Sequence, residues 1–402
     1  FRSALSAQRV GNSIGSAPAL ARMQPAGYKR GMSSATIADL GVGPAQRELL
    51  TRHGFDLRTF ASLRKELRAG KFTPERNRVV ESIAPPRKGD LVDWPESDDR
   101  EARACEAAGQ AAILRGEVAV AILNGGMATR FGGRVKGVVE VMDGKGFLGL
   151  RLEDVGRASK TMPVFLMNSF ATLDATAAHL AEHDHFGLAP ARVHLLTQRI
   201  SIRLTPTGEL FHDHHGDVSL YAPGHGDLFE VLATSAAFRT FVDGGGKLVM
   251  IGNVDNLGAT VSPKVVGAHL RGGKPVTVEV APRVAGDKGG APVRRADRLE
   301  VLEGFRFPPD FDIDTVPVFN TNTFVMDVAA MRADYALTWF RADKEVDGLP
   351  AVQFERLMGE VTAFVDSTYL RVPREGRENR FMPVKTPADL DTLRPALRAR
   401  LA

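Results

Sequence analysis

Short runs of consecutive apolar residues, each followed by a polar or glycine-rich turn, characterise the chain after Glu117. We expect these runs to be buried strands, because a central strand of a parallel sheet contacts apolar groups on both of its faces. Stretches with helical periodicity lie between several of them, at 172–183 and 228–241. This alternation predicts an α/β domain around a mainly parallel sheet. The predicted strands cover 118–123, 164–167, 193–196, 248–251 and 276–280.

The residues before this domain have a different pattern. Apolar residues recur at near-helical spacing over 43–70, and 97–114 is again typical of a helix. The segment 83–96 contains three prolines and predicts an irregular connector. Near the other end, 383–397 predicts a strand, a turn and a helix. The chain is therefore divided into a leader at 1–38, a helical N-terminal region at 39–115 and a large α/β domain at 116–402.

Composition and charge narrow the classes of function. With 402 residues, 44% of them hydrophobic and 25% charged, the chain has an ordinary globular composition. The net charge of +4 owes much to the leader, which has five basic residues and no acidic residue before Asp39. We therefore expect no nucleic-acid partner. Apolar runs stay well below the roughly 18 residues that span a bilayer, so we expect no membrane segment.

The leader itself is expected to be disordered or artefactual, and the protein cytoplasmic. Its acid-free, arginine- and serine-containing composition also fits an organelle-targeting segment, which is the alternative. The single cysteine, Cys105, excludes an intramolecular disulfide, and we assign it no role.

The first candidate for chemistry is the loop NGGMATR at 124–130, directly after the first predicted strand. Its glycines allow close approach of the backbone and can direct N–H groups at phosphate. Arg130 and Lys136 add positive charge suited to a triphosphate. The spacing is neither that of a Walker A loop nor G-x-G-x-x-G, and a glycine-rich turn without a ligand is the alternative.

Three further segments carry polar side chains at the ends of apolar runs. In MIGNVDNLGAT at 250–260, Asp255 is placed either to hold Mg²⁺ or to form an Asx-turn. In YAPGHGD at 221–227, a rigid turn displays His225, which can donate a hydrogen bond to phosphate. In RFMPVKTPADL at 380–390, Lys385 precedes a predicted helix and can reach phosphate or remain solvated.

Taken in series, these motifs resemble the UDP-glucose pyrophosphorylases, the UTP–hexose-1-phosphate uridylyltransferases, in their eukaryote-like branch. The resemblance covers about 110–395 and includes LMNSF at 166–170, TQRISIRL at 197–204, DKGG at 287–290, LEGFRFP at 302–308 and FNTNTF at 319–324. It implies a Rossmann-like (GT-A-like) nucleotidyltransferase domain at 116–402 with a mixed, mainly parallel sheet flanked by helices. The chain ends near where many relatives begin a C-terminal β-helix, so no full β-helix domain is expected, and the oligomeric state is open.

The resemblance also implies a reaction and its residues. A hexose 1-phosphate, by default glucose 1-phosphate, would attack the α-phosphorus of UTP in line, forming a UDP-sugar and releasing pyrophosphate with the assistance of Mg²⁺. The implied metal ligand is Asp255, and the phosphate-neutralising residues are Lys136, Lys385 and Arg130. The implied nucleotide contacts are Leu123, Asn124, Gly125, Gly126, Met127, Ala128, Thr129, Gln198 and Gly224. The implied sugar-phosphate contacts are His225, Asn253, Gly289, Glu303, Asn320 and Asn322.

The chain departs from the family pattern at several positions. Ala128 replaces a glycine, Val135 replaces the proline before Lys136, and Phe305 and Arg306 replace smaller or amide residues on the sugar side. Two alternatives stay open. One is a UDP-N-acetylhexosamine pyrophosphorylase, which the His-Gly-Asp end of the turn at 221–227 disfavours. The other is a non-catalytic UDP-sugar-binding protein, which Ala128 favours.

Two histidine-rich segments resemble metal sites. FHDHHGD at 211–217 is interpreted as a polar turn, because contiguous residues point in different directions. His179 and His183 are four residues apart on a predicted helix, but the sequence shows no evident third ligand, so we interpret them as part of a solvated helix face.

Overall fold

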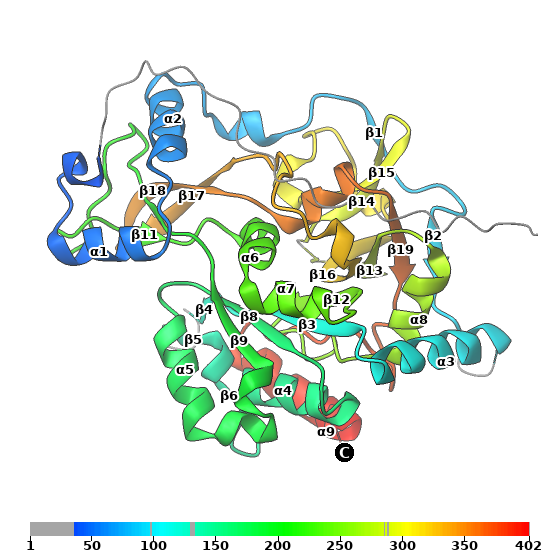
Figure 1. The fold of residues 1–402 in the computed structure, drawn as a ribbon. Coiled ribbons are helices and arrows are strands. Elements are labelled where there is room, and N and C mark those ends of the chain that lie inside the picture. The colour runs from blue at the N-terminus through cyan, green and yellow to red at the C-terminus, as the bar shows by residue number, and fades with distance from the viewer. Residues whose placement is uncertain (1–35, 97–98, 129–132, 285, 288, 402) are drawn as a thin grey trace, which may run out of the picture. The chain divides into compact units, whose positions relative to one another are not determined.

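The structure, a computed structural model, describes residues 36–401 except 97–98, 129–132, 285 and 288, so the leader expected at 1–38 falls almost wholly outside the described residues (Figure 1). From Ile37 onward the chain forms one compact unit, and the division expected at residue 115 stays a prediction. The helices are α1 (Pro44–Arg52), α2 (Leu57–Arg68), α3 (Arg100–Leu114), α4 (Phe147–Ala158), α5 (Leu173–Glu182), α6 (Leu228–Thr234), α7 (Ala236–Asp243), α8 (Pro263–Gly272) and α9 (Pro387–Leu401).

An eight-stranded sheet organises this unit. Its strands, in spatial order, are β2 (Leu91–Asp93), β19 (Ser367–Arg371), β13 (Val276–Pro282), β16 (Val318–Asp327), β12 (Leu248–Asn253), β3 (Val118–Leu123), β8 (Val164–Asn168) and β9 (Val193–Thr197). Neighbouring strands are parallel except at β16, which runs antiparallel to both β12 and β13. The predicted α/β domain with a mainly parallel sheet is confirmed.

Both faces of the central strands are covered, which explains their unbroken apolar sequences. All six residues of β3 are buried. Val118, Val120 and Ile122 contact a cluster that includes residues of α4, α8 and α9, whereas Ala119 and Ala121 contact one that includes residues of α6 and α7. Figure 1 shows these two groups of helices on opposite sides of the sheet.

Smaller sheets surround this core. They are β1 (Ile83–Ala84) with β14 (Ala291–Arg295) and β15 (Arg298–Leu302), β10 (Ser201–Ile202) with β11 (Leu220–Tyr221), β17 (Phe340–Val346) with β18 (Leu349–Glu355), β4 (Met127–Ala128) with β5 (Arg134–Val135), and β6 (Glu140–Met142) with β7 (Lys145–Gly146). A separate apolar cluster joins α1 and α2 to β10 and β18. The helical N-terminal region thus supports a wall made of β10, β11 and β18.

Three predicted elements differ in detail. The helix expected over 228–241 is divided at Ser235, whose extended backbone ends α6 and whose hydroxyl accepts a hydrogen bond from the N–H of Phe238 to cap α7. The connector at 83–96 contains β1 and β2, and β2 pairs with β19 at the sheet edge. At the C-terminal end, the expected strand is reduced to one bridge between Asn256 and Pro383 before α9 begins.

Helices α3 and α8 meet without intervening side chains. A Cβ atom on Gly109 of α3 would lie 1.8 Å from the carbonyl oxygen of Pro263. Reciprocally, a Cβ atom on Gly267 of α8 would lie 1.7 Å from the carbonyl oxygen of Cys105. The two backbones are therefore in direct contact, which only glycine permits at these positions.

Among the helices of the described residues, none has the length and apolar character needed to cross a bilayer.

Candidate functional site

The carboxyl ends of four neighbouring strands meet at one edge of the sheet. In the register of the sheet, Leu123 at the end of β3 is opposite both Met167 of β8 and Asn253 at the end of β12. The segments that leave these strands therefore gather at one place, where ligands of open α/β sheets bind. A cavity of about 570 Å³ lies there, within the size range of small-molecule sites.

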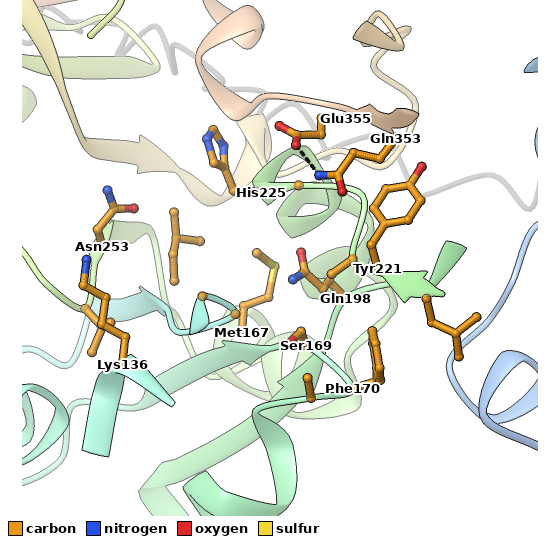
Figure 2. Close-up of a pocket in the computed structure, with 18 of the residues that line it drawn as sticks. Lys136, Met167, Ser169, Phe170, Gln198, Tyr221, His225, Asn253, Gln353 and Glu355 are labelled. Atoms are coloured by element: carbon orange, nitrogen blue, oxygen red, sulfur yellow. Dashed lines mark hydrogen bonds between the residues drawn. The ribbon is translucent and has the colours of Figure 1, made fainter. Parts of the chain in front are cut away.

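Figure 2 shows how side chains from different elements surround this cavity. Lys136 and Asn253 lie at one end, and Gln198, Tyr221 and Gln353 lie toward the other. The predicted site residues that line the cavity are Leu123, Gly125, Gly126, Lys136, Gln198, Gly224, His225, Asn253 and Asp255.

The side chain of Asn124 anchors the start of the glycine-rich loop to β8 and α5. This side chain is buried, and its amide nitrogen donates to Asn168 Oδ1 at 2.8 Å and to Thr176 Oγ1 at 2.9 Å. Gly125 lies so close to the side chain of Gln198 that a Cβ atom on this glycine would lie 2.5 Å from Nε2 of Gln198. The sequence predicted that a ligand could approach the backbone of this loop closely. In the structure, the group that lies closest to Gly125 is the amide side chain of Gln198.

After Gly126 the chain forms a hairpin. Met127 and Ala128 make up β4, which pairs antiparallel with β5 and leads the chain back to Lys136. Ala128 is extended there, a conformation that residues other than glycine adopt without strain. The predicted site residues Thr129 and Arg130 lie outside the described residues.

Gln198 lines the cavity and carries a buried polar atom without a hydrogen-bond partner among the described residues. It follows β9, its backbone N–H donates to the carbonyl oxygen of Asn168 at 2.9 Å, and only 5% of its surface is exposed. Its Oε1 atom is buried and has no hydrogen-bond partner among the described residues. Because an unpaired buried carbonyl is costly, this oxygen is placed to accept a hydrogen bond from a ligand.

The turn at 221–227 is held rigidly against the segment after β18. Gly224 has φ +97°, and a Cβ atom on it would lie 2.6 Å from the carbonyl oxygen of Arg356. The fully buried carboxylate of Asp227 forms an ion pair with the Arg356 guanidinium and accepts a hydrogen bond from the backbone N–H of Arg199 at 3.0 Å. Both glycine and aspartate of this motif therefore fix the loop that carries His225.

The environment of His225 determines its protonation. Burial lowers its pKa from 6.5 to about 4, so the imidazole is neutral near pH 7. Its Nδ1 atom accepts a hydrogen bond from the backbone N–H of Met358 at 2.9 Å. The proton of the neutral ring is therefore on Nε2, and the side chain is an uncharged hydrogen-bond donor.

The opposite end of the cavity contains the pair of Lys136 and Asp255. Their side chains form an ion pair, with about a fifth of each exposed. The neighbouring Asn256 is buried and fixes this loop, because its Oδ1 accepts hydrogen bonds from the backbone N–H groups of Gly258 at 3.2 Å and Met382 at 2.9 Å. Asp255 is thus presented to the cavity by an anchored loop.

A chain of amides leads from this end toward the predicted sugar contacts. Asn322 Nδ2 donates to Asn253 Oδ1 at 2.9 Å, and the backbone N–H of Asn322 donates to Asn320 Oδ1 at 3.0 Å. Asn322 has φ +57°, and its Oδ1 is buried without a partner among the described residues. Such backbone strain is found preferentially at functional positions.

Glu303 and Gly289 belong to the same neighbourhood. A Cβ atom on Gly359 would lie 3.5 Å from Glu303 Oε1 and 3.6 Å from Asn320 Nδ2, so these two groups lie close together. Burial raises the pKa of Glu303. A Cβ atom on Gly289 would lie 3.5 Å from the carbonyl oxygen of Asn320. The described residues that line the cavity do not include the predicted site residues Asn124, Gly289, Glu303, Asn320 and Asn322.

Lys385 differs from the other predicted residues. Its neighbour Val384 donates a backbone hydrogen bond to the carbonyl oxygen of Asp255 at 3.2 Å, so the two segments are adjacent. However, Lys385 is exposed, its backbone N–H donates to Asp389 at 2.8 Å, and the described residues that line the cavity do not include it. The expected convergence on one pocket therefore holds for the glycines, Lys136 and Asp255, but not for the side chain of Lys385.

One wall of the cavity was not predicted. Arg203 Nε donates to Gln353 Oε1 at 3.1 Å. Gln353 Nε2 in turn donates to Glu355 at 2.5 Å, the hydrogen bond drawn in Figure 2. The hydroxyl of Tyr221 accepts a hydrogen bond from the backbone N–H of Phe354 at 2.8 Å. Arg203 and Tyr221 lie within recognised motifs, but nothing in the sequence of β18 indicated that Gln353 and Glu355 face a site.

Residues 60–397 match the family model of UTP–glucose-1-phosphate uridylyltransferase. A protein of that name from Musa acuminata is 31% identical over 299 residues, which are 69% of this chain and 62% of the relative. The chain therefore spans about three fifths of the length of this relative.

Solved structures support the fold. A uridine diphosphate N-acetylglucosamine pyrophosphorylase from Trypanosoma brucei, in complex with an inhibitor, is similar with a TM-score of 0.71 and 22% identity over 87% of this chain and 79% of that one. The UDP-glucose pyrophosphorylase from Leishmania major has a TM-score of 0.63 and 23% identity, over 88% of this chain and 76% of that one. These likenesses confirm the predicted nucleotidyltransferase-type fold.

Proposed function

The chain belongs to the UTP–glucose-1-phosphate uridylyltransferase family, and from that premise we propose that it joins UTP to a hexose 1-phosphate, forming a UDP-sugar and pyrophosphate. The observation that carries the proposal is the arrangement of the cavity at the carboxyl ends of β3, β8, β9 and β12. It offers a buried hydrogen-bond acceptor on Gln198 and, at the other end, the Lys136–Asp255 pair.

We place the uracil ring against Gly125, with its N3–H donating to Gln198 Oε1. The lack of a side chain on Gly125 supports this position, because a flat base can approach the backbone only where no Cβ intervenes. The unpaired acceptor supports it as well, since uracil has a hydrogen-bond donor at N3, where cytosine has none. Thus Gln198 would select UTP over CTP.

The phosphates would extend toward Lys136 and Asp255. Lys136 supplies the positive charge that an anionic sugar phosphate needs in order to approach a polyanionic nucleotide. The neutral Nε2–H of His225 would donate to a phosphate oxygen of the hexose 1-phosphate. Asn253 and Asn322, joined by their amides, would orient the hexose together with Asn320, Glu303 and Gly289.

The residues present fit a magnesium ion. Asp255 offers a carboxylate to the cavity, and Mg²⁺ is commonly held by one or two carboxylates together with substrate phosphates. When bound, the ion would neutralise charge on the phosphate oxygens. The adjacent Lys136 already shares the carboxylate of Asp255, so both cations would serve the same end of the substrate.

The reaction would be a direct displacement. An oxygen of the hexose 1-phosphate forms a bond to the α-phosphorus of UTP, and the bond from that phosphorus to the bridging oxygen breaks, so that the electron pair leaves with pyrophosphate. The side chains of this chain need form no covalent intermediate. Their contributions are alignment of the two substrates and neutralisation of their charges.

Pyrophosphate release tests the proposal. The protein is incubated with UTP, Mg²⁺ and separate hexose 1-phosphates, including N-acetylglucosamine 1-phosphate, because a similar solved structure is a UDP-N-acetylglucosamine pyrophosphorylase. Release with glucose 1-phosphate supports the proposed substrate, and release only with the N-acetylated sugar favours that alternative. Binding of UDP-sugars without release with any sugar phosphate would refute the enzyme assignment in favour of a binding protein.

Charge substitutions identify the residues. We expect Lys136→Ala to lower kcat at least about 100-fold with little change in stability, since its role is to stabilise developing charge and it is partly exposed. Lys385→Ala, on an exposed residue, should leave stability unchanged, and wild-type turnover would remove Lys385 from the mechanism. Lys65→Ala, also exposed but on α2, is the matched control.

A further inference from the structure

The last turn of α5 gathers three potential metal ligands that the proposed reaction does not use. His179, Glu182 and His183 each direct one ligand atom to the same place, and these atoms lie within 4.8 Å of one another. Their spacing of three and four residues puts them on one face of the helix. The sequence showed the two histidines, and the structure adds Glu182 as the third ligand.

The hydrogen bonding of His183 prepares it for coordination. Its Nδ1 atom lies 3.0 Å from the backbone carbonyl oxygen of His179, which can only accept a hydrogen bond. The proton of the neutral ring is therefore on Nδ1, and the lone pair is on Nε2. A backbone carbonyl that fixes the ring in this way is a common second partner of metal-bound histidine.

His179 has a complementary feature. Its Nε2 atom is buried and has no hydrogen-bond partner within the described part of the chain. The ring centroids of His179 and His183 are 4.3 Å apart, so this nitrogen lies beside the second imidazole. An unpaired buried nitrogen is unfavourable, and a metal ion would satisfy it.

The turn after α5 holds both rings in place. Asp184, His185 and Phe186 all have φ between 46° and 53°, which turns the chain sharply and returns Phe186 over the histidines. The Phe186 ring stacks on His183 at 5.0 Å and lies 5.4 Å from His179. Phe186 also fills the space over Gly149 of α4, where a Cβ atom would lie 2.5 Å from the ring. The two imidazole ligands are therefore restrained before a metal ion binds.

We propose that His179, Glu182 and His183 form a binding site for a divalent transition-metal ion, of which Zn²⁺ fits best. Two imidazole nitrogens and one carboxylate oxygen are typical zinc ligands and leave positions for water. Nitrogen ligands disfavour Mg²⁺, which requires oxygen. The site is therefore chemically distinct from the carboxylate of Asp255.

The position of the site gives binding a structural effect. Thr176 lies three residues before His179 on α5, and its hydroxyl accepts the hydrogen bond from Asn124 that anchors the glycine-rich loop. An ion that bridges the last turn of α5 would stabilise the helix that carries this contact. Zn²⁺ should accordingly raise the melting temperature of the free protein, because it binds the folded chain.

Metal titration of the nucleotide-free protein tests the proposal. After treatment with a chelator, Zn²⁺ is titrated calorimetrically, and Co²⁺ is added separately to record the visible absorption of a bound ion. We expect one equivalent to bind. His183→Ala should weaken binding at least about 100-fold, since even the loss of an outer-shell partner costs 10- to 100-fold. Glu182→Gln, on an exposed side chain that does not threaten folding, should weaken binding about 10-fold.

The histidine-rich turn at 211–217 provides the control. His215→Ala removes an exposed histidine from that turn and should leave both the affinity and the Zn²⁺-induced rise in melting temperature unchanged. The proposal is overturned if wild-type protein binds no stoichiometric ion, if His183→Ala and Glu182→Gln bind as tightly as wild type, or if only His215→Ala reduces binding.

Discussion

Replacing Gln198 by leucine tests two effects of its unpaired Oε1 atom separately: the effect on the stability of the free protein and the effect on binding of UTP. In the free protein, Oε1 of Gln198 is buried without a partner among the described residues, a situation that costs about 1–3 kcal/mol. Leucine has a similar volume and no polar atom. We therefore expect the free energy of unfolding of Gln198→Leu to stay the same or to rise by about 1 kcal/mol.

The effect on nucleotide binding should have the opposite sign. In the variant, the N3–H of uracil would be buried without an acceptor, which costs about 1–3 kcal/mol. The dissociation constant for UTP should therefore increase by roughly 5- to 150-fold. Because the same oxygen would repel the N3 lone pair of cytosine, the wild-type preference for UTP over CTP should largely disappear.

Two measurements and one control suffice for this test. Urea denaturation of the free protein gives stability, and calorimetric titration with UTP and CTP gives affinity. The control is Gln353→Leu, because Gln353 already bonds Arg203 and Glu355, so its loss should lower stability. A Gln198→Leu protein that binds UTP as tightly as wild type, or that loses more than about 1.5 kcal/mol of stability, would refute the assigned role.

Three further substitutions probe the scaffold. Gly224→Ala should cost about 2–3 kcal/mol in urea denaturation, because its φ of +97° and the 2.6 Å approach to Arg356 both exclude a Cβ atom; wild-type stability would contradict this. Because the pKa of His225 is about 4 when folded and 6.5 otherwise, the unfolded chain binds the extra proton between these values, so stability should fall on the order of 3 kcal/mol as pH drops from 6.5 to 4. His225→Asn should lack this part of the pH dependence, and an unchanged profile would reject the neutral imidazole. Glu279→Gln should lose about 3–5 kcal/mol, since Glu279 and Arg380 form an almost fully buried ion pair at 2.6 Å, and a loss below about 1 kcal/mol would argue against it.

The sequence predicted five of the eight strands of the sheet, because burial on both faces leaves a strong signature, but it missed β2, β16 and β19. The strand at Val118–Leu123 matches β3 at both ends, and Gly125 and Gly126 of the loop that follows it line the cavity. Because parallel strands present their carboxyl ends at one edge, Asp255 at the end of its strand was expected near the glycine-rich loop. The place of Gln198 in the site, by contrast, was implied by the family resemblance and not by periodicity or strand direction.

The parts that the sequence could not predict depend on tertiary contacts. Gln353 and Glu355 reach the cavity because β18 is packed against β10 and the N-terminal helices, an arrangement without local sequence signal. The orientation of Lys385 likewise depends on how Val384 pairs with the Asp255 loop. Glu182 is a different case, because its spacing of three residues from His179 already placed it on the histidine face, and the sequence interpretation missed it.

Because α3 and α8 contact each other through Gly109 and Gly267, substitutions at these two positions should be coupled in evolution. Any larger residue at Gly109 would have to be accommodated by movement of α8, which carries Gly267 and follows the loop of Asp255. A substitution by a larger residue at only one of the two positions should therefore be selected against. Among homologues, we expect both positions to be glycine or both to be substituted. Where they are substituted, the distance between the axes of α3 and α8 should be larger.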